Sequence, residues 1–220
     1  MKSKSATTSF AQATKVTPIL GTGSEFEANI PWDWSGETHA HGGFITSLLF
    51  STARVYFLSN HPSRSLPDPI TIHVQFLLPV EMGVARLRVD EIMIGKRYST
   101  LQITVLNQKG SGHQSCVTAI ITQGNLSTEA GQNIDVPPIL SKKEIPDREI
   151  ACEEWITPNW LAKLLPVSSK WRIRTLKGSK NQFLSRKGLN VKYIWMKWAD
   201  EKEKLDVISL GILCDSSFDR

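Results

Sequence analysis

The sequence predicts an α+β fold in which one long helix packs on an antiparallel sheet. Two observations lead to this prediction. Residues 42–58 place apolar side chains at helical spacing, and four segments between residues 70 and 123 alternate apolar and polar side chains as strands do. Short turns separate these strands, which excludes the crossover helices of a doubly wound nucleotide-binding fold.

The helix begins at His41-Gly42-Gly43 and carries an apolar stripe at the spacing of one helical face. The stripe consists of Ile45, Leu48, Leu49, Thr52, Val55 and Tyr56. Glycines at a helix start leave the first backbone N–H groups unshielded, at the positive end of the helix dipole. Such a pair can hold a carbonyl oxygen or a phosphate, although glycines before a helix also simply make turns.

The strands follow in a simple order. A short strand is expected over residues 25–31, and a clear alternating strand covers residues 70–78 and stops at Pro79. Further strands are predicted over residues 84–94, 97–108 and 113–123, with turns at Gly95-Lys96 and at residues 109–112. This is a meander of antiparallel strands behind one helix.

The rest of the chain divides into three pieces. Residues 1–24 are predicted to be a disordered lead-in, and residues 126–150, rich in proline and polar side chains, a linker. Residues 151–220 contain alternating segments at 171–174 and 191–198 and an apolar helix over 206–218, with Asp206 as N-cap. Strands and a helix in both halves indicate an internal duplication, with Ser51 aligned to Asp215.

Composition sets outer limits on function. The chain has 220 residues, 40% of them apolar and 21% charged, and its longest apolar runs are far shorter than a membrane span. Three cysteines and no secretory leader predict an intracellular, cytoplasmic protein, with peroxisome and mitochondrion as alternatives. The formal net charge is +5, and the basic excess lies in residues 141–220, which could attract phosphates or form a solvated surface.

Several segments resemble one family, the acyl-CoA thioesterases of the double hotdog fold. The matching features are Gly42-Gly43 at the helix start, Phe76-Leu77-Leu78-Pro79 at a strand end, Gly95-Lys96-Arg97 before the third strand, Gln108, and Gln123-Gly124. The resemblance covers residues 25–125 and extends more loosely over 150–220. It implies a hotdog fold with one complete repeat, the N-terminal hotdog at 25–125, and one partial repeat, the C-terminal hotdog at 151–220. The chain is similar to the thioesterase-like proteins of fungi, some of which serve secondary metabolism.

The resemblance also implies a catalytic aspartate on the second helix, and this position is Asp215. We expect Ile212, Leu213 and Phe218 to bury Asp215, as suits a general base, and His41, Gly42 and Gly43 to line the oxyanion and substrate site. The family places a threonine and a glutamine on strands after this helix, whereas the chain ends at Arg220. We therefore expect a truncated gene model, a fragment, or a variant that completes its sheet from a partner subunit.

The first repeat offers a weaker second candidate site of Ser51, Thr71 and Gln123. Serine cannot replace a carboxylate as a base, so these residues are more simply polar lining between helix and sheet. His39 and His41 have no third ligand at a suitable spacing, so no metal is expected.

The sequence thus predicts a hydrolase that cleaves an acyl thioester with an activated water and needs no cofactor. The alternative is a non-hydrolytic hotdog protein that binds or shapes a small molecule in secondary metabolite biosynthesis. The expected partners are acyl-CoA, or another small acyl or aromatic ligand, and a second copy of the chain. Neither nucleic acid nor a membrane is expected.

Overall fold

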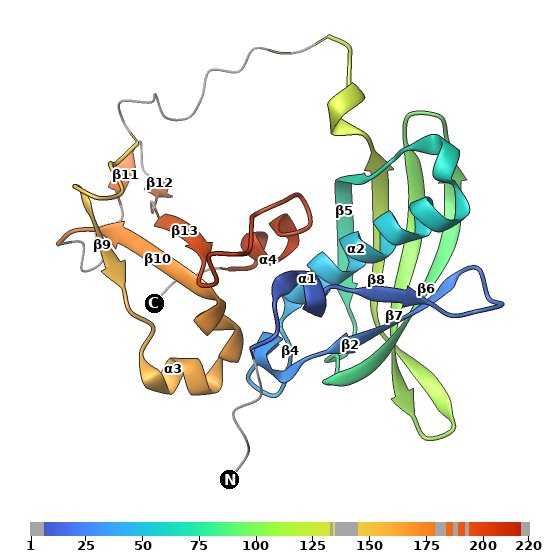
Figure 1. The fold of residues 1–220 in the computed structure, drawn as a ribbon, viewed down its shortest axis with the longest axis horizontal. Helices are drawn as coiled ribbons and strands as arrows, with labels where there is room; N and C mark the ends of the chain where they lie inside the picture. Colours follow the sequence, from blue (N-terminus) through green and yellow to red (C-terminus); the bar gives the residue numbers. More distant parts are fainter. Residues whose placement is uncertain are drawn as a thin grey trace.

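The computed structural model describes residues 7–132, 134, 145–178, 184–186, 189–191 and 194–216. Its main feature is a six-stranded antiparallel sheet in the order β1-β2-β6-β7-β8-β5 (Figure 1). The strands are β1 (Val16–Pro18), β2 (Glu25–Ile30), β5 (Asp68–Phe76), β6 (Gly83–Ile94), β7 (Ser99–Lys109) and β8 (Gly112–Gly124). The strands predicted from residue 25 to residue 123 are confirmed, with ends that differ by at most a few residues.

Helix α2 (Gly42–Asn60) crosses one face of this sheet, as the α+β prediction requires (Figure 1). Its predicted stripe is buried apart from Val55, which is half-buried. Phe44, Ser47, Phe50 and Ala53 are buried as well, so the helix is enclosed on more than the sheet side. Other parts of the chain must therefore cover the face that the amphipathic pattern left open.

Part of this cover comes from the N-terminal segment, which forms helix α1 (Phe10–Ala13) and strand β1. A capping box between Ser9 and Gln12 starts α1, and β1 pairs with β2. The predicted disordered lead-in is therefore wrong for residues 7–24, because Phe10 has an apolar partner in Trp34, at 5.6 Å between ring centroids. Residues 1–6 lie outside the described residues.

The link between sheet and C-terminal region is only partly described. The 3₁₀ helix η3 (Leu126–Thr128) follows β8, and part of the linker predicted over 126–150 lies outside the described residues. Beyond it, β9 (Cys152–Trp155), β10 (Trp171–Leu176) and β13 (Ile194–Trp198) form a small sheet in the order β13-β10-β9. We refer to the described residues from 145 to 216 as the C-terminal part.

The C-terminal part also contains α3 (Asn159–Leu164), η4 (Pro166–Lys170), and the paired strands β11 (Leu184–Arg186) and β12 (Leu189–Val191). The strand predicted at 171–174 is confirmed, whereas the one predicted at 191–198 is divided between β12 and β13. The helix predicted over 206–218 is shorter, since α4 spans Leu210–Cys214. Asp206 Oδ1 accepts a hydrogen bond from Ser209 N at 2.9 Å and so caps the turn before α4. Phe218 lies outside the described residues.

Aromatic rings join the C-terminal part to α2 and to the segment just before it. Trp34, in η1 (Trp32–Trp34), stacks on Phe44 of α2 at 5.4 Å and meets Trp198 of β13 edge-on at 5.8 Å. Trp198 in turn stacks on Trp171 at 4.0 Å. The buried Lys170 Nζ donates to Thr8 O and to an Asp33 carboxylate oxygen, which ties three separate segments together. The two regions therefore share one core, and no helix in the described residues is long and apolar enough to cross a membrane.

Candidate functional site

The start of helix α2 is held rigidly by backbone hydrogen bonds. Strands β3 (Ser35–Gly36) and β4 (His39–Ala40) form a tight hairpin just before it. Ala40 N donates to Val80 O at 2.9 Å, and His41 N donates to Trp34 O at 3.2 Å. His41 is the N-cap residue, so the N–H groups of Gly42 and Gly43 point out of the helix end without intrahelical partners.

Asp215, from the C-terminal end of α4, lies against this helix start. Gly43 N donates a hydrogen bond of 2.6 Å to Asp215 Oδ2, although the two residues are 172 positions apart in the sequence. His41 Nδ1 lies 3.6 Å from the same carboxylate oxygen. The structure therefore brings together all four residues of the main predicted site: His41, Gly42, Gly43 and Asp215.

This approach is possible because glycines lie where α2 and α4 touch. A Cβ atom on Gly43 would lie 2.7 Å from Asp215 Cβ, and one on Gly211 would lie 2.5 Å from Ser47 N. Ser47 Oγ also accepts a hydrogen bond from Ile212 N at 2.9 Å. Each helix thus contributes a glycine and, four residues later, a polar side chain.

Sequence reasoning missed Ser47 and Gly211. It aligned Ser51 with Asp215, but in the structure Ser47, one helical turn earlier, makes the contact with α4. The signal that could have identified them is the equal spacing of Gly43 to Ser47 and of Gly211 to Asp215. Both pairs place small or short side chains on one helix face.

The electrostatics of the site differ from the expectation. Burial lowers the pKa of His41, and the nearby Asp215 carboxylate opposes that effect only partly, so the imidazole is neutral at pH 7. His41 Nδ1 is buried and has no hydrogen-bond partner among the described residues. The Asp215 side chain is 54% exposed, so the expected burial of this carboxylate is wrong. It lies at the rim of the contact between α2 and α4, where solvent reaches it.

The second predicted set, Ser51, Thr71 and Gln123, is not assembled. Thr71 is exposed and pairs with Thr122, so it faces away from the helix, whereas the neighbouring Gln123 is fully buried on the helix-facing side. Ser51 is half-buried on α2. The Gln123 amide has no hydrogen-bond partner among the described residues and lies six residues along β8 from Val117, a distance of about 20 Å.

Val117, near the middle of β8, marks the level of the sheet that is close to Asp215. It pairs with Phe76, and a Cβ atom on Gly42 would lie 3.4 Å from the Phe76 ring and 3.0 Å from Asp215 Oδ2. Gln123, next to the last residue of β8, is therefore about 20 Å along the strand from the level of Asp215. No three His, Cys, Asp or Glu side chains in the described residues gather as metal ligands would.

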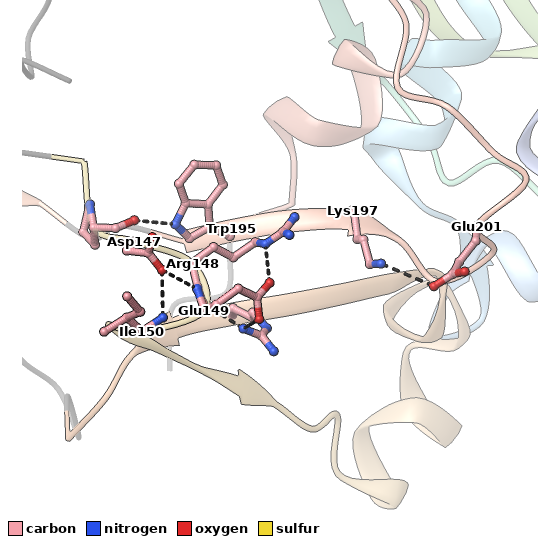
Figure 2. Close-up of polar contacts among 9 residues, drawn as sticks. Asp147, Arg148, Glu149, Ile150, Trp195, Lys197 and Glu201 are labelled. Atoms are coloured by element: carbon pink, nitrogen blue, oxygen red, sulfur yellow. Dashed lines mark hydrogen bonds and ion pairs between the residues drawn. The ribbon is translucent and has the colours of Figure 1, made fainter. Parts of the chain in front are cut away.

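Several basic side chains of the C-terminal part lie in ion pairs with glutamates (Figure 2). Glu149 accepts hydrogen bonds from Arg148 at 2.8 Å and from Arg174 at 2.6 Å. Lys197 Nζ and Arg172 Nη1 lie 3.4 and 3.6 Å from Glu201 Oε1. Because these cations already have carboxylate partners, their attraction for a phosphate is weaker than the composition suggests.

Comparisons with known proteins support the fold. Residues 30–124 match the family model described as the acyl-CoA thioesterase N-terminal domain. This segment runs from the end of β2 to the end of β8 and includes all of α2. The chain has a hotdog fold, and its residues 30–124 are similar to the N-terminal domain of acyl-CoA thioesterases. The predicted resemblance is confirmed for residues 30–124, and so is the hotdog fold that it implied.

Solved structures with a hotdog fold extend the similarity beyond the matched segment. A protein of unknown function from Alicyclobacillus acidocaldarius is 19% identical, with a TM-score of 0.64 over 97% of this chain and 70% of that one. A proposed thioesterase from Novosphingobium aromaticivorans is 14% identical, with a TM-score of 0.60 over 91% of this chain and 71% of that one. A proposed thioesterase II from Thermobifida fusca is 16% identical, with a TM-score of 0.60 over 76% of this chain and 56% of that one. No curated protein sequence matches, and identities at this level support the shared fold alone.

Proposed function

We propose that this hotdog protein hydrolyses an acyl thioester of coenzyme A with a water molecule that Asp215 activates. The observation that supports the proposal is the 2.6 Å hydrogen bond from Gly43 N to Asp215 Oδ2. It fixes a solvent-accessible carboxylate at the positive end of α2. The hydrogen bond engages Oδ2, and we assign Oδ1 to the attacking water.

The reaction needs one base and one set of hydrogen-bond donors. Asp215 takes a proton from water as the water oxygen attacks the thioester carbonyl carbon. The carbonyl oxygen gains negative charge, the C–S bond breaks, and the thiolate leaves with its electron pair. The proton on Asp215 then passes to the thiolate, which yields a carboxylic acid and free thiol and restores the carboxylate.

Donors for the developing oxyanion come from the first turn of α2. Gly43 N–H is engaged by Asp215, so we assign the neighbouring Gly42 N–H to the substrate oxygen. A side chain on Gly42 would meet Asp215 at 3.0 Å and Phe76 at 3.4 Å, so only glycine leaves this approach open. Neutral His41 lies beside both groups, where it can contact the substrate without adding a positive charge.

One observation favours the alternative, a hotdog protein that binds a small molecule without hydrolysis. The Asp215 carboxylate accepts the hydrogen bond of Gly43 N–H, so of the two glycine N–H groups only that of Gly42 is left as a donor for an oxyanion. The predicted role in secondary metabolism belongs with this alternative. In that case the site would bind its ligand but release no thiol.

Thiol release from a panel of acyl-CoA esters distinguishes the two functions. We expect release by the unmodified chain and a loss of a hundredfold or more in Asp215→Asn, the range usual for a general base. Asp90→Asn is the matched control, because Asp90 is an exposed aspartate of β6 whose partner is Arg88. No release from a correctly folded protein, or equal release from Asp215→Asn, would contradict the hydrolase.

We also propose that the protein self-associates. Leu77 and Leu78, which follow β5 at the edge of the sheet, are exposed, and solvent-exposed apolar edges promote association. Light scattering at micromolar concentration is expected to give a mass above that of one chain. A mass equal to one chain would contradict the proposal.

A further inference from the structure

Strand β5 carries a row of apolar side chains, Ile72, Val74 and Phe76, on the face of the sheet that covers α2. We refer to these three residues as the β5 strip. Their partners on β8 are Ile121, Ala119 and Val117, all fully buried. Because directly opposed residues in a sheet share one face, the β5 strip belongs to the core side.

The β5 strip is nevertheless open to solvent. Phe76 is 48% exposed, and Ile72 and Val74 are half-buried. The cause is the position of β5, which is the last strand of the sheet and pairs only with β8 among the described residues. Helix α4, which covers the start of α2, is only five residues long. An apolar surface roughly 13 Å long therefore runs from Phe76 to Ile72, given the rise per residue of a β-strand.

This surface begins at the proposed reaction centre. Gly42 lies between the Asp215 carboxylate and the Phe76 ring, since a Cβ atom there would be 3.0 Å from one and 3.4 Å from the other. A thioester carbonyl held at Gly42 N–H would therefore have Phe76 as an apolar neighbour. The strip leads away from this point along β5.

The far end of β5 is polar. Arg54 Nη2 lies 3.8 Å from Asp68 Oδ1, and Arg54 Nε donates to Pro67 O at 2.9 Å. An apolar chain that extends past Ile72 would approach this partly exposed pair and remove water from its charges, which costs free energy. The opposite face of β5 carries the exposed Thr71, His73 and Gln75, so only one side of the strand suits an apolar ligand.

We propose that the β5 strip binds the acyl chain of the substrate, with Phe76 beside the carbons next to the carbonyl. The substrate class is then an unbranched aliphatic acyl thioester of medium length, because short acyl groups reach only Phe76 and long ones meet Arg54 and Asp68. This inference rests on the proposed function. The occupant is assigned from the continuity of the strip with the Asp215–Gly42 contact.

Binding of stable ketone analogues, the S-(2-oxoalkyl) derivatives of coenzyme A, tests the assignment on the unmodified chain. Each methylene that leaves water contributes about fourfold in Kd. We expect the decyl analogue to bind at least tenfold more tightly than the butyl analogue, with no further gain beyond the length that reaches Ile72.

Two substitutions locate the chain along the strip. Phe76→Ser is expected to weaken every analogue longer than acetyl at least fivefold, whereas Val74→Thr weakens only the analogues long enough to reach Val74. Val74→Thr preserves side-chain volume, so it keeps the test valid if Phe76→Ser fails to fold. Ile120→Thr is the control, because Ile120 is an exposed apolar residue on the opposite face of the sheet, where it pairs with His73.

The outcomes separate the two proposals. If affinity does not depend on acyl chain length, or if it falls equally in Ile120→Thr, the assignment of the acyl chain to the β5 strip would be overturned. The proposal of thioester hydrolysis would still stand. Failure of every analogue and of coenzyme A itself to bind would overturn both. A stable dimer that Phe76→Ser converts to single chains would assign the strip to an interface between copies and overturn the acyl site.

Discussion

The sheet domain (residues 25–124) and the C-terminal part contribute in different ways to the core that they share. In the sheet domain, β6, β7 and β8 are 12, 11 and 13 residues long, and the sheet that they form packs against α2 of the same domain. In the C-terminal part, β9, β10 and β13 have four to six residues. Trp198 packs against Phe10 of the N-terminal segment and Trp34 of η1, and Trp171 stacks on Trp198. The C-terminal part, which supplies Asp215, therefore depends for its stability on the sheet domain.

Matched core truncations give the largest expected effect on this comparison. Ile121→Ala in β8 and Ile173→Ala in β10 remove the same atoms from buried sites and should each cost about 2–5 kcal/mol of unfolding free energy. We expect Ile121→Ala to destabilise the whole protein. Ile173→Ala should instead unfold the C-terminal part first, seen as a tryptophan fluorescence transition at lower urea than the circular dichroism transition. Coincident transitions in both variants would show that the two regions form one cooperative unit.

The contact between α2 and α4 can be loosened with one methyl group. Gly211→Ala places a Cβ atom 2.5 Å from Ser47 N, so α4 must move away, at a cost of about 1–3 kcal/mol. We expect faster proteolysis of the C-terminal part and loss of thiol release, while the sheet domain stays protected. Gly112→Ala is the control, since its Cβ atom would meet only Lys109 O, at 3.9 Å. Equal behaviour of the two variants would contradict the close contact.

Lys170 tests the polar link between the regions. Its ammonium group is buried, and desolvation lowers its pKa despite the attraction of Asp33. Lys170→Met should cost about 1–2 kcal/mol, because Asp33 keeps its hydrogen bond from Thr8 N at 2.7 Å and is partly solvated. Lys197→Met removes an exposed cation from the same part and should change the unfolding free energy by less than about 0.5 kcal/mol. Urea denaturation compares the two, and an equal cost would contradict a specific role for Lys170.

The smallest expected effect is a pH dependence at the site. The pKa of His41 is lowered from 6.5 in the folded state, so the unfolded chain takes up its proton first as pH falls. The unfolding free energy should therefore decrease as pH drops from 6.5 toward the lower folded pKa, and His41→Gln should remove that slope. In Asp215→Asn the NMR titration of His41 should shift to still lower pH, because the carboxylate that opposes the effect of burial is gone. An unchanged titration would mean that the two side chains do not interact.

The fold and half of the site were readable from local patterns. Alternation in β5 to β8 and the stripe on α2 determine the sheet and its helix, because side-chain periodicity follows directly from backbone geometry. The pattern at the helix start singled out Gly42 and Gly43 with His41 beside them, and family resemblance singled out Asp215; the structure brings these residues together. The contact of Ser47 with Ile212 N and the position of Gln123 were not readable, because they depend on which residues face one another across the fold.

Local patterns also could not predict that the N-terminal segment is ordered. Residues 7–24 have little apolar periodicity, and their structure comes from Phe10 and Thr8 reaching partners in η1, η4 and β13. The exposure of Asp215 and of Phe76 likewise depends on how far α4 extends over α2 and β5.

The sequence alone determined an α+β chain that resembles acyl-CoA thioesterases, with a helix start that contains two glycines and with a candidate carboxylate. Only the tertiary structure decided that the carboxylate accepts a hydrogen bond from that helix start, and that β5 leaves an apolar strip beside it. The physical reason is that periodicity records which side of an element is apolar. Contacts between residues 172 positions apart arise from the packing of whole elements.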